Sequence, residues 1–266
     1  MRKVLAIVWR DAKLDMSYPG QFAMQWVAIC VGVSGFYFVS KLVRPNGSLG
    51  FGGHASTYFS YVIVNVAFMV LLTNAVQGFG KQLRRDQFVE MIEPIFATPT
   101  PVGLIVFSYG IWKLLLASMQ AALYLMVASL FFGLDLRGTD IAALGLFTIL
   151  SVACMAAIGV IGAGVVIYSK TEPPSNFIVG GAGALLSGVL FPIALLPHPL
   201  RILSWLLPMT HALHGLRGAT RGATLSQLSG DAIWLAIASA ILLPVAFFAF
   251  NRSVDHARTD GTLAHS

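Results

Sequence analysis

The sequence predicts an all-α, polytopic membrane protein with six transmembrane helices. The 266-residue chain is 57% hydrophobic and only 11% charged, whereas ordinary soluble domains carry about 25% charged residues. Six stretches of the chain are also apolar over more than the roughly 18 residues that indicate a membrane-spanning helix. These observations exclude a soluble enzyme, a disordered chain and a secreted disulfide-rich domain.

The charge and cysteine content agree with this class. The net charge of +6 and the pI of about 9.6 would suggest nucleic acid as a partner in a soluble protein. Here the basic residues lie mainly in short loops, as is typical of cytoplasmic loops of membrane proteins, so no nucleic-acid partner is expected. Cys30 and Cys154 lie within apolar stretches, and we expect them to pack as small hydrophobic residues rather than to form a disulfide or a metal site.

Residues 1–20 predict an amphipathic helix that lies in the headgroup plane. At helical spacing the basic side chains fall on the side opposite to a group of apolar side chains. This apolar group consists of Val4, Leu5, Val8, Trp9, Ala12 and Met16. Tyr18-Pro19-Gly20 then ends the helix, so that the chain can turn into the bilayer. A simple membrane anchor and a helix that also contacts a cytoplasmic partner both fit this pattern.

The six spans are predicted within residues 21–251, as helices that satisfy their own backbone hydrogen bonds. They lie near Phe22–Ser40, Thr57–Phe79, Val102–Leu134, Ile141–Tyr168, Phe177–Leu196 and Ala232–Phe250. Lys113 interrupts the third span, and we expect its long side chain to reach the cytoplasmic edge. Glycines in the fourth and fifth spans, such as Gly159 and Gly180, predict close approach between helices.

An even number of spans places both termini on one side of the membrane, and the basic residues indicate the cytoplasm. Ten lie on the side of the termini: Arg2, Lys3, Arg10, Lys13, Lys81, Arg84, Arg85, Lys170, Arg252 and Arg258. Six lie on the opposite side: Lys41, Arg44, Arg137, Arg201, Arg217 and Arg221. We therefore expect a multi-pass protein of the cell (inner) membrane whose short tail, residues 252–266, is cytoplasmic.

The loop between the second and third spans predicts a short helix parallel to the membrane at about residues 84–97. Apolar side chains recur at helical spacing, with acidic residues between them. The apolar set is Phe88, Met91, Ile92, Ile95 and Phe96, and the acidic set is Asp86, Glu90 and Glu93. Two interpretations stay open: a surface helix with a solvated charged face, or a docking helix that transmits force from a soluble motor domain.

The segment before the last span, about residues 190–220, is apolar and interrupted by prolines. This composition predicts short re-entrant or interfacial helices near Leu200–Leu207 and Thr210–Leu216. His198, His211 and His214 suggest a metal site, but no carboxylate or thiolate lies close to them in the sequence, so a polar interface is favoured over a metal site. For Arg217 and Arg221 we expect pairing with lipid headgroups or an anionic substrate.

The chain resembles the permease subunits of type-2 ABC exporters over nearly its whole length. The 84–97 and 190–220 segments carry most of this resemblance. The similarity is strongest in an ordered run of short motifs before the last span. This run is Ser187-Gly-Val-Leu-Phe-Pro192, then Leu196-Pro197, then Leu207-Pro208-Met-Thr210-His-Ala-Leu-His-Gly-Leu-Arg217. Members of that family typically have Gly-x-x-Phe-Pro, then Leu-Pro, then a helix that begins with Pro-x-Thr.

The resemblance implies an exporter in which two permeases, identical or different, form the translocation path above ATP-binding subunits. ATP and Mg are then bound by the partner, because this chain has no Gly-x-x-x-x-Gly-Lys-Ser/Thr motif, and we expect no cofactor and no catalytic residue in the chain itself. The resemblance assigns ATPase coupling to Arg84, Arg85, Asp86, Phe88, Glu90, Ile92, Glu93 and Phe96. It assigns the interfacial helix to Arg2–Asp15, including Val4, Leu5, Val8, Trp9 and Arg10.

Aromatic and polar side chains in the first two spans form a candidate translocation path. These are Phe36, Tyr37, Tyr58, Tyr61 and Asn65. Aromatic residues also gather at any membrane interface, so an aromatic belt remains the alternative. The apolar external segment favours an amphipathic substrate, such as a lipid, a glycolipid or a drug-like molecule, with a polysaccharide as the other option.

Two further classes of protein were weighed against an exporter subunit. A self-sufficient channel or secondary transporter usually has ionisable or unwound sites near the bilayer midplane, whereas these spans are nearly free of charge. An intramembrane enzyme needs a Ser/His pair, paired Asp residues or His-Glu-x-x-His within a span, and none occurs. The channel or secondary transporter, working without an ATPase partner, stays the main alternative.

Overall fold

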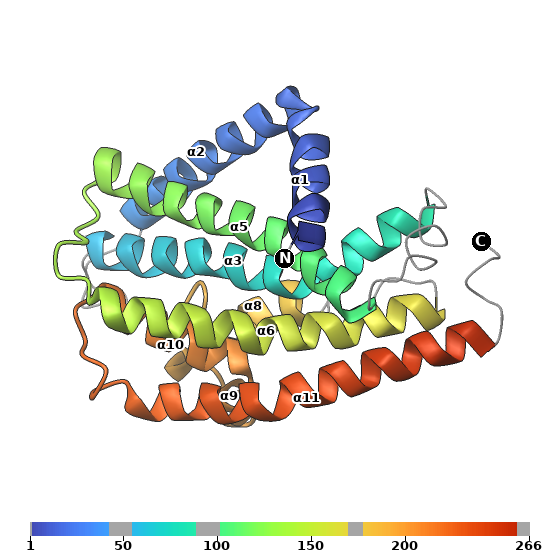
Figure 1. The fold of residues 1–266 in the computed structure, drawn as a ribbon. Helices are drawn as coiled ribbons and strands as arrows, with labels where there is room; N and C mark the ends of the chain where they lie inside the picture. Colours follow the sequence, from blue (N-terminus) through green and yellow to red (C-terminus); the bar gives the residue numbers. More distant parts are fainter. Residues whose placement is uncertain (1, 43–54, 89–101, 170–177, 260–266) are drawn as a thin grey trace.

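The computed structural model describes residues 2–42, 55–88, 102–169 and 178–259, and its elements there are helices (Figure 1). The long helices are α1 (Arg2–Met16), α2 (Pro19–Leu42), α3 (Ala55–Phe88), α5 (Val102–Phe132), α6 (Ile141–Ser169) and α11 (Ser229–Thr259). The short ones are η1 (Ile178–Ala182), α8 (Gly183–Leu186), η2 (Ile193–Leu195), α9 (His198–Leu206) and α10 (Pro208–Thr220). Among these residues, five helices are long and apolar enough to cross a membrane: α2, α3, α5, α6 and α11. The all-helical membrane fold is thus confirmed.

Helices α3 and α6 occupy the centre of the bundle. In the most apolar stretch of α3, 67% of the residues are buried, whereas the value for the corresponding stretch of α2 is 17%. Helix α3 packs against α5 and α6, while α6 also packs against α10 and α11. Their contacts form one large apolar core, in which Leu72 of α3, Phe147 of α6 and Leu213 of α10 are almost fully buried.

The predicted close approach of helices occurs at Gly159, where α6 crosses α3. A Cβ atom at this position would lie 2.5 Å from the carbonyl oxygen of Val76 and 2.8 Å from that of Ala75. Gly180 makes no such approach, because the nearest atom to a Cβ there would be Nε2 of Gln77 at 3.7 Å. The prediction of close approach is therefore confirmed at Gly159 and is wrong at Gly180.

The fifth predicted span, Phe177–Leu196, is wrong as a continuous helix over its described part. The chain forms a π-helical turn, η1, then the single turn α8, and leaves the helix after Leu186. Gly188 has φ 71°, a conformation that ends helices and favours glycine. The structure therefore has five candidate spans in its described residues, rather than the six that were predicted.

Helix α3 is longer than the second predicted span, Thr57–Phe79. Its 34 residues correspond to about 51 Å of helix, whereas the hydrocarbon core of a bilayer is about 30 Å thick. Arg84, Arg85, Asp86 and Phe88 continue α3 and do not begin a separate helix. The other predicted coupling residues, Glu90, Ile92, Glu93 and Phe96, lie outside the described residues.

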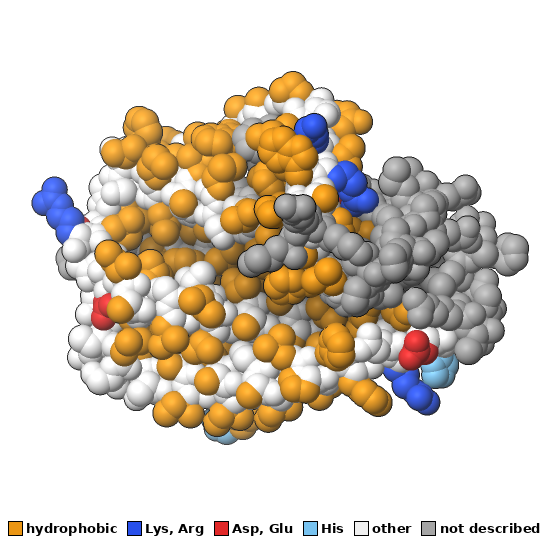
Figure 2. Space-filling view, in the orientation of Figure 1, with side chains coloured by type: hydrophobic (Ala, Val, Ile, Leu, Met, Phe, Trp, Pro, Cys, Tyr) orange, Lys and Arg blue, Asp and Glu red, His pale blue; other side chains and the backbone are white. Residues whose placement is uncertain are grey.

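The distribution of side chains agrees with a membrane-embedded bundle. On the face shown in Figure 2, hydrophobic side chains cover much of the described surface, and the charged ones lie toward the two ends and near the top. Exposed apolar side chains are frequent on α11, for example Ile237, Ile241 and Phe248. In water such a surface would be unfavourable, and lipid chains or another membrane helix would cover it.

Candidate functional site

The candidate site is built around α10, which packs against α3, α6 and α11. Leu207 is extended, and Pro208 begins the helix at a position where a missing N–H costs nothing. At the other end of α10, the amide of Asp140 donates to the carbonyl oxygen of Ala219 over 3.0 Å. Hydrogen bonds to the loop before α6 therefore hold the C-terminal turn of α10 in place.

A histidine–aspartate cluster, made of His211, His214 and Asp231, joins α10 to the start of α11. Nδ1 of His211 lies 2.6 Å from one carboxylate oxygen of Asp231, and Nδ1 of His214 lies 2.6 Å from the other. Nε2 of His211 lies 2.9 Å from the carbonyl oxygen of Trp205. Both ring nitrogens of His211 thus face oxygen acceptors, and only an imidazolium can donate to both.

Indole rings surround the imidazole of His211. The ring of Trp234 stacks on it with centroids 4.4 Å apart, and that of Trp205 lies 5.5 Å away. Burial alone would lower the pKa of His211, but the hydrogen bonds to Asp231 and to the Trp205 carbonyl, with the charge of Asp231, together raise it above its ordinary value. The pKa shift and the geometry both favour a charged imidazole.

A second group, the Arg217 cluster, consists of Arg217, Tyr61 and Asn65. The guanidinium carbon of Arg217 lies 4.5 Å from the centroid of the Tyr61 ring, and Nη1 lies 3.5 Å from Oδ1 of Asn65. Burial has the largest effect on the pKa of Arg217 and lowers it. The side chain nevertheless stays cationic at neutral pH, as arginines in proteins do.

The Arg217 cluster is tied to the point where the fifth predicted span breaks. The Tyr61 hydroxyl donates to the carbonyl oxygen of Gly188 over 2.6 Å. Nδ2 of Asn65 donates to the same oxygen over 3.2 Å and to that of Val189 over 3.1 Å. Backbone carbonyls that the broken helix leaves without partners are satisfied in this way by α3.

The prediction for the histidines is partly corrected. The sequence analysis found no carboxylate near them, but folding brings Asp231 to His211 and His214 from 20 and 17 residues away in the sequence. His198 stays exposed and lies outside the cluster. In the described part of the chain, no group of His, Cys, Asp or Glu has the arrangement of a metal site.

The candidate path residues separate into two groups. Tyr61 and Asn65 join Arg217, and Phe36 and Tyr58 pack beside Tyr61. Tyr37 instead belongs to an aromatic group, with its ring centroid 5.7 Å from that of Phe59 and 4.8 Å from that of Phe132. The structure thus brings together four of the five residues, Phe36 of α2 with Tyr58, Tyr61 and Asn65 of α3.

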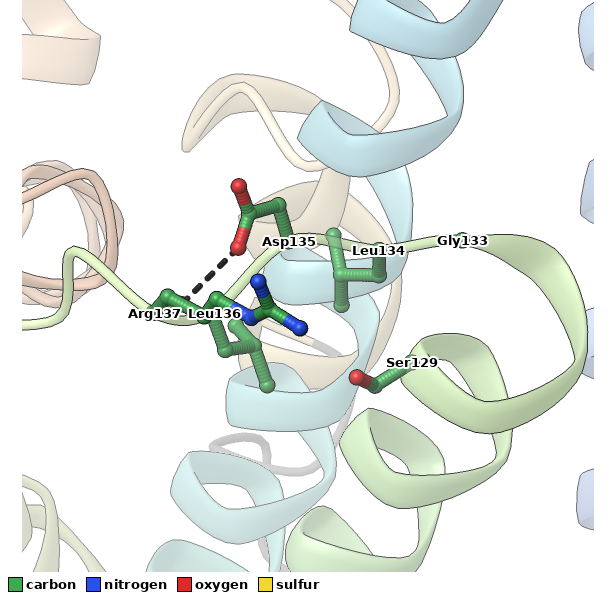
Figure 3. Close-up of a pocket in the computed structure, with 6 residues that line it drawn as sticks. All are labelled: Ser129, Gly133, Leu134, Asp135, Leu136 and Arg137. Carbon is green, nitrogen blue, oxygen red and sulfur yellow. Dashed lines mark hydrogen bonds between the residues drawn. The ribbon is translucent and has the colours of Figure 1, made fainter.

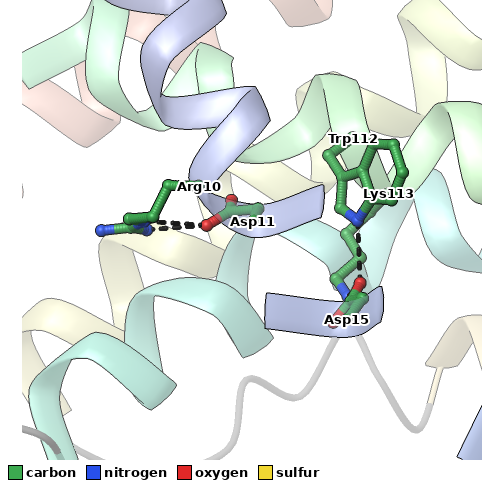
Figure 4. A network of polar contacts seen from close by, with 5 residues as sticks. All are labelled: Arg10, Asp11, Asp15, Trp112 and Lys113. Carbon is green, nitrogen blue, oxygen red and sulfur yellow. Dashed lines mark hydrogen bonds and ion pairs between the residues drawn. The ribbon is translucent and has the colours of Figure 1, made fainter. Parts of the chain in front are cut away.

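A polar group at the other end of the bundle anchors α1 (Figure 4). The carboxylate of Asp15 accepts hydrogen bonds from Nε1 of Trp112 and Nζ of Lys113, each over 2.8 Å. Arg10 pairs with Asp11 over 2.9 Å. Of these residues only Arg10 is among the predicted site residues. The signal for the two aspartates is their i, i+4 spacing, which places them on one face of α1.

A pocket lies where the chain passes from α5 to α6 (Figure 3). It has a volume of about 520 Å³ and is lined by Ser129, Gly133, Leu134, Asp135, Leu136 and Arg137. The carboxylate of Asp135 accepts a hydrogen bond from the amide of Arg137 over 3.0 Å. The pocket is open to its surroundings. Its lining contains one acidic side chain, Asp135, and one basic side chain, Arg137, and none of its polar lining residues is buried.

Comparison with known proteins decides the family. The family model described as ABC-2 type transporter matches residues 2–220, which is most of the chain. The chain belongs to the ABC-2 type transporter family. No curated protein matches it.

The resemblance seen in the sequence is therefore confirmed, and the chain is an ABC-2 permease, a transport subunit of the membrane. The match extends from α1 to the end of α10, so it includes Arg217. Asp231 of α11 lies beyond it. The histidine–aspartate cluster of this ABC-2 permease thus joins a matched segment to an unmatched one.

The residues assigned to the interfacial helix of the permease lie on α1. Ile7 of this helix packs against an inner cluster that includes Phe79 and Leu83 of α3 and Tyr109 of α5. Leu5 and Trp9 are exposed, while Val4, Val8 and Arg10 are partly buried. Helix α1 thus presents one side to the bundle and exposes apolar side chains on the other.

Proposed function

We propose that the chain is the permease of an ATP-driven exporter, in which two permeases form the translocation path and each contacts a separate ATP-binding subunit. The family supports a transport role for the membrane subunit. The long apolar helices and the scarcity of charge within them suit a path through the bilayer. On this proposal both termini are cytoplasmic and the membrane is the cell (inner) membrane, as the distribution of basic residues indicates.

The observation that supports the proposal most strongly is the way the helices pack at the end of the bundle that we propose to face the cytoplasm. Phe79 and Leu83 of α3, Tyr109 of α5, Ala163 of α6 and Phe250 of α11 belong to one buried cluster. Helix α1 packs on this cluster through Ile7. A motor subunit that pushed on α1 or on the end of α3 would therefore displace several spans together, which is what coupling by rigid contact requires.

The proposed substrate is an amphipathic molecule, such as a lipid, a glycolipid or a drug-like compound, with a polysaccharide as the other option. The apolar side chains of α9 support the first class, because Leu200, Ile202 and Leu206 are exposed beside the polar groups of α10. An amphiphile needs an apolar surface and a polar surface next to each other.

The proposal is tested by purifying the tagged chain from its native membranes in a mild detergent. Mass spectrometry of the eluate should find a P-loop ATPase in stoichiometric amount, and the eluate should hydrolyse ATP. The same tag on an unrelated multi-pass protein serves as the control for non-specific recovery. A folded chain that purifies without an ATPase would contradict the proposal and favour a channel or a secondary transporter.

A further inference from the structure

We propose that the Arg217 cluster is an oxyanion site that receives the phosphate or carboxylate head of an amphiphilic substrate. This inference rests on the proposed transport function and names the substrate class of that same path. It is carried by the charge, burial and contacts of Arg217, Tyr61 and Asn65 in the outer half of the bundle.

The guanidinium of Arg217 has unused hydrogen-bonding capacity. Arginine has five N–H donors in a planar fork. Within the part of the chain that the structure describes, Arg217 contacts Oδ1 of Asn65 at 3.5 Å and the side chain of Tyr61, and it forms no direct ion pair with a carboxylate. A partly buried cation without a counter-charge is unfavourable, so an anion at this place would be stabilised.

The nearest candidate counter-charge is already engaged. Both carboxylate oxygens of Asp231 accept hydrogen bonds at 2.6 Å, one from His211 and one from His214. The imidazolium of His211 balances the charge of Asp231. Arg221, the residue that follows the last residue of α10, is a second cation that acts on Arg217. Asp231 acts on Arg217 only from a distance and Arg221 opposes it, so no carboxylate of the described residues neutralises the guanidinium by direct contact.

Tyr61 and Asn65 hold the guanidinium in a defined orientation. The Tyr61 ring supports it by a cation–π contact at 4.5 Å, which leaves the edges of the planar group for ligands. The amide nitrogen of Asn65 donates to two carbonyl oxygens, so its own oxygen faces Arg217. A fork held in this way suits bidentate binding of a phosphate or carboxylate.

The site lies at the break in the fifth predicted span, which explains how a polar head can be accommodated. The carbonyl oxygens of Gly188 and Val189 accept hydrogen bonds from Tyr61 and Asn65. Backbone that is not helical is tolerated at membrane depth only where protein or water surrounds it. Helix α9, which precedes α10 in the chain, exposes apolar side chains that could contact the tail of an amphiphile.

The test measures binding of lysophosphatidic acid to the purified full-length chain, with any subunit that co-purifies, in an uncharged detergent. A monoacylglycerol of the same acyl chain is the uncharged reference. A charge-assisted hydrogen bond contributes enough to change affinity by about tenfold or more. We expect the wild type to prefer lysophosphatidic acid by at least about tenfold, and Arg217→Gln to remove this preference while leaving binding of the monoacylglycerol unchanged.

Two further variants and one competitor complete the design. Arg137→Gln removes an exposed cation from the outer loop and should keep the preference, while Arg217→Lys should restore part of it because charge remains without the planar fork. Displacement of the probe by inorganic phosphate would support a site open to free oxyanions. Failure of phosphate to displace it would support an oxyanion site that needs the attached chain.

The proposal is overturned if the wild type binds lysophosphatidic acid no more tightly than the monoacylglycerol, a result that does not depend on any variant. It is also overturned if Arg217→Gln retains the preference for lysophosphatidic acid. Equal loss of both lipids in Arg217→Gln would indicate a structural role and would also overturn it. The experiment measures lipid binding to the permease and not transport. Absence of an ATPase partner would therefore contradict the proposed ATP-driven export without affecting the test of the oxyanion site.

Discussion

Gly159 determines how closely α3 and α6 approach at the centre of the bundle. Its missing side chain allows the backbone of α6 to lie against the carbonyl oxygens of Val76 and Ala75. These are backbone atoms, which cannot move aside as a flexible side chain can. Packing between helices in lipid depends on such contacts, because burial from water supplies no driving force there.

Gly159→Ala is therefore expected to destabilise the protein by about 1–3 kcal/mol, as other overpacking substitutions do. The measurement is the thermal midpoint of the purified protein, followed by size-exclusion chromatography after heating. Gly145→Ala is the matched control on the same helix, since a Cβ there meets nothing within 4 Å. An unchanged midpoint in Gly159→Ala would show that the helices separate at little cost.

His211 of α10 connects three helices, through Asp231 of α11 and the backbone of Trp205 in α9. Its pKa is raised in the folded protein. A raised pKa adds stability that is fully present below the ordinary value of about 6.5 and is lost as the pH rises through the raised value.

The thermal midpoint of the wild type should therefore fall as the pH rises from about 6.5 toward alkaline values. A loss of about 1 kcal/mol corresponds to about 2–4 °C in a protein of this size. His211→Gln should show a flatter profile over the same range, and His198→Gln, at an exposed position, should follow the wild type. Parallel profiles for wild type and His211→Gln would contradict the charged state of His211.

At the scale of elements, α1 is joined to α5 by a polar contact in addition to its apolar packing. Asp15 and Lys113 form an ion pair at 2.8 Å, with side chains that are 23% and 28% exposed. The expectation from the sequence was that Lys113 reaches the edge of the membrane. The structure shows that Lys113 pairs with Asp15, and its place relative to the membrane edge stays a prediction.

Asp15→Asn should loosen α1 while the bundle stays folded, because asparagine can still accept from Trp112 but cannot pair with a cation. Hydrogen exchange should become several-fold faster in residues 4–16 and remain unchanged in α6. Asp15→Asn, Lys113→Met and the double variant should have similar effects, with a coupling free energy of about 1 kcal/mol or less.

Lys13→Met is the control for this experiment, since Lys13 is an exposed cation on the same helix. Additive effects of the Asp15 and Lys113 variants would mean that the pair does not anchor α1.

At the scale of the whole molecule, coupling to an ATPase is proposed to occur where α3 leaves the bundle. The described part of the predicted coupling segment, from Arg84 to Phe88, is helical and continuous with α3. Glu90 and Glu93 follow outside the described residues. On this proposal the acidic side chains there meet the motor subunit directly, and a few residues of an interface usually carry most of its binding energy.

Replacing Glu90 and Glu93 together with Gln is expected to abolish export while insertion and folding survive. The readouts are ATP hydrolysis by the purified complex and recovery of the ATPase subunit, which should fall by about thirtyfold if each of the two carboxylates contributes about 1 kcal/mol. Glu172→Gln changes an acidic residue in another predicted cytoplasmic loop and should leave both unchanged. Normal recovery and hydrolysis in the double variant would remove the coupling assignment.

The sequence by itself determined the class of fold and the place of most elements. The spans near Phe22–Ser40, Val102–Leu134 and Ile141–Tyr168 correspond to α2, α5 and α6. The short helices α9 and α10 were also predicted from the prolines that separate them. These features depend on runs of apolar residues and on proline, which act within one segment of chain.

Only the tertiary structure decided where the predicted fifth span breaks and which polar groups meet. The carbonyl of Gly188 can leave the helix because Tyr61 and Asn65, more than 120 residues earlier, donate to it. Asp231 reaches His211 and His214 because α10 and α11 pack together. Hydrogen bonds and ion pairs act over a few ångströms, so their partners depend on which helices folding brings into contact.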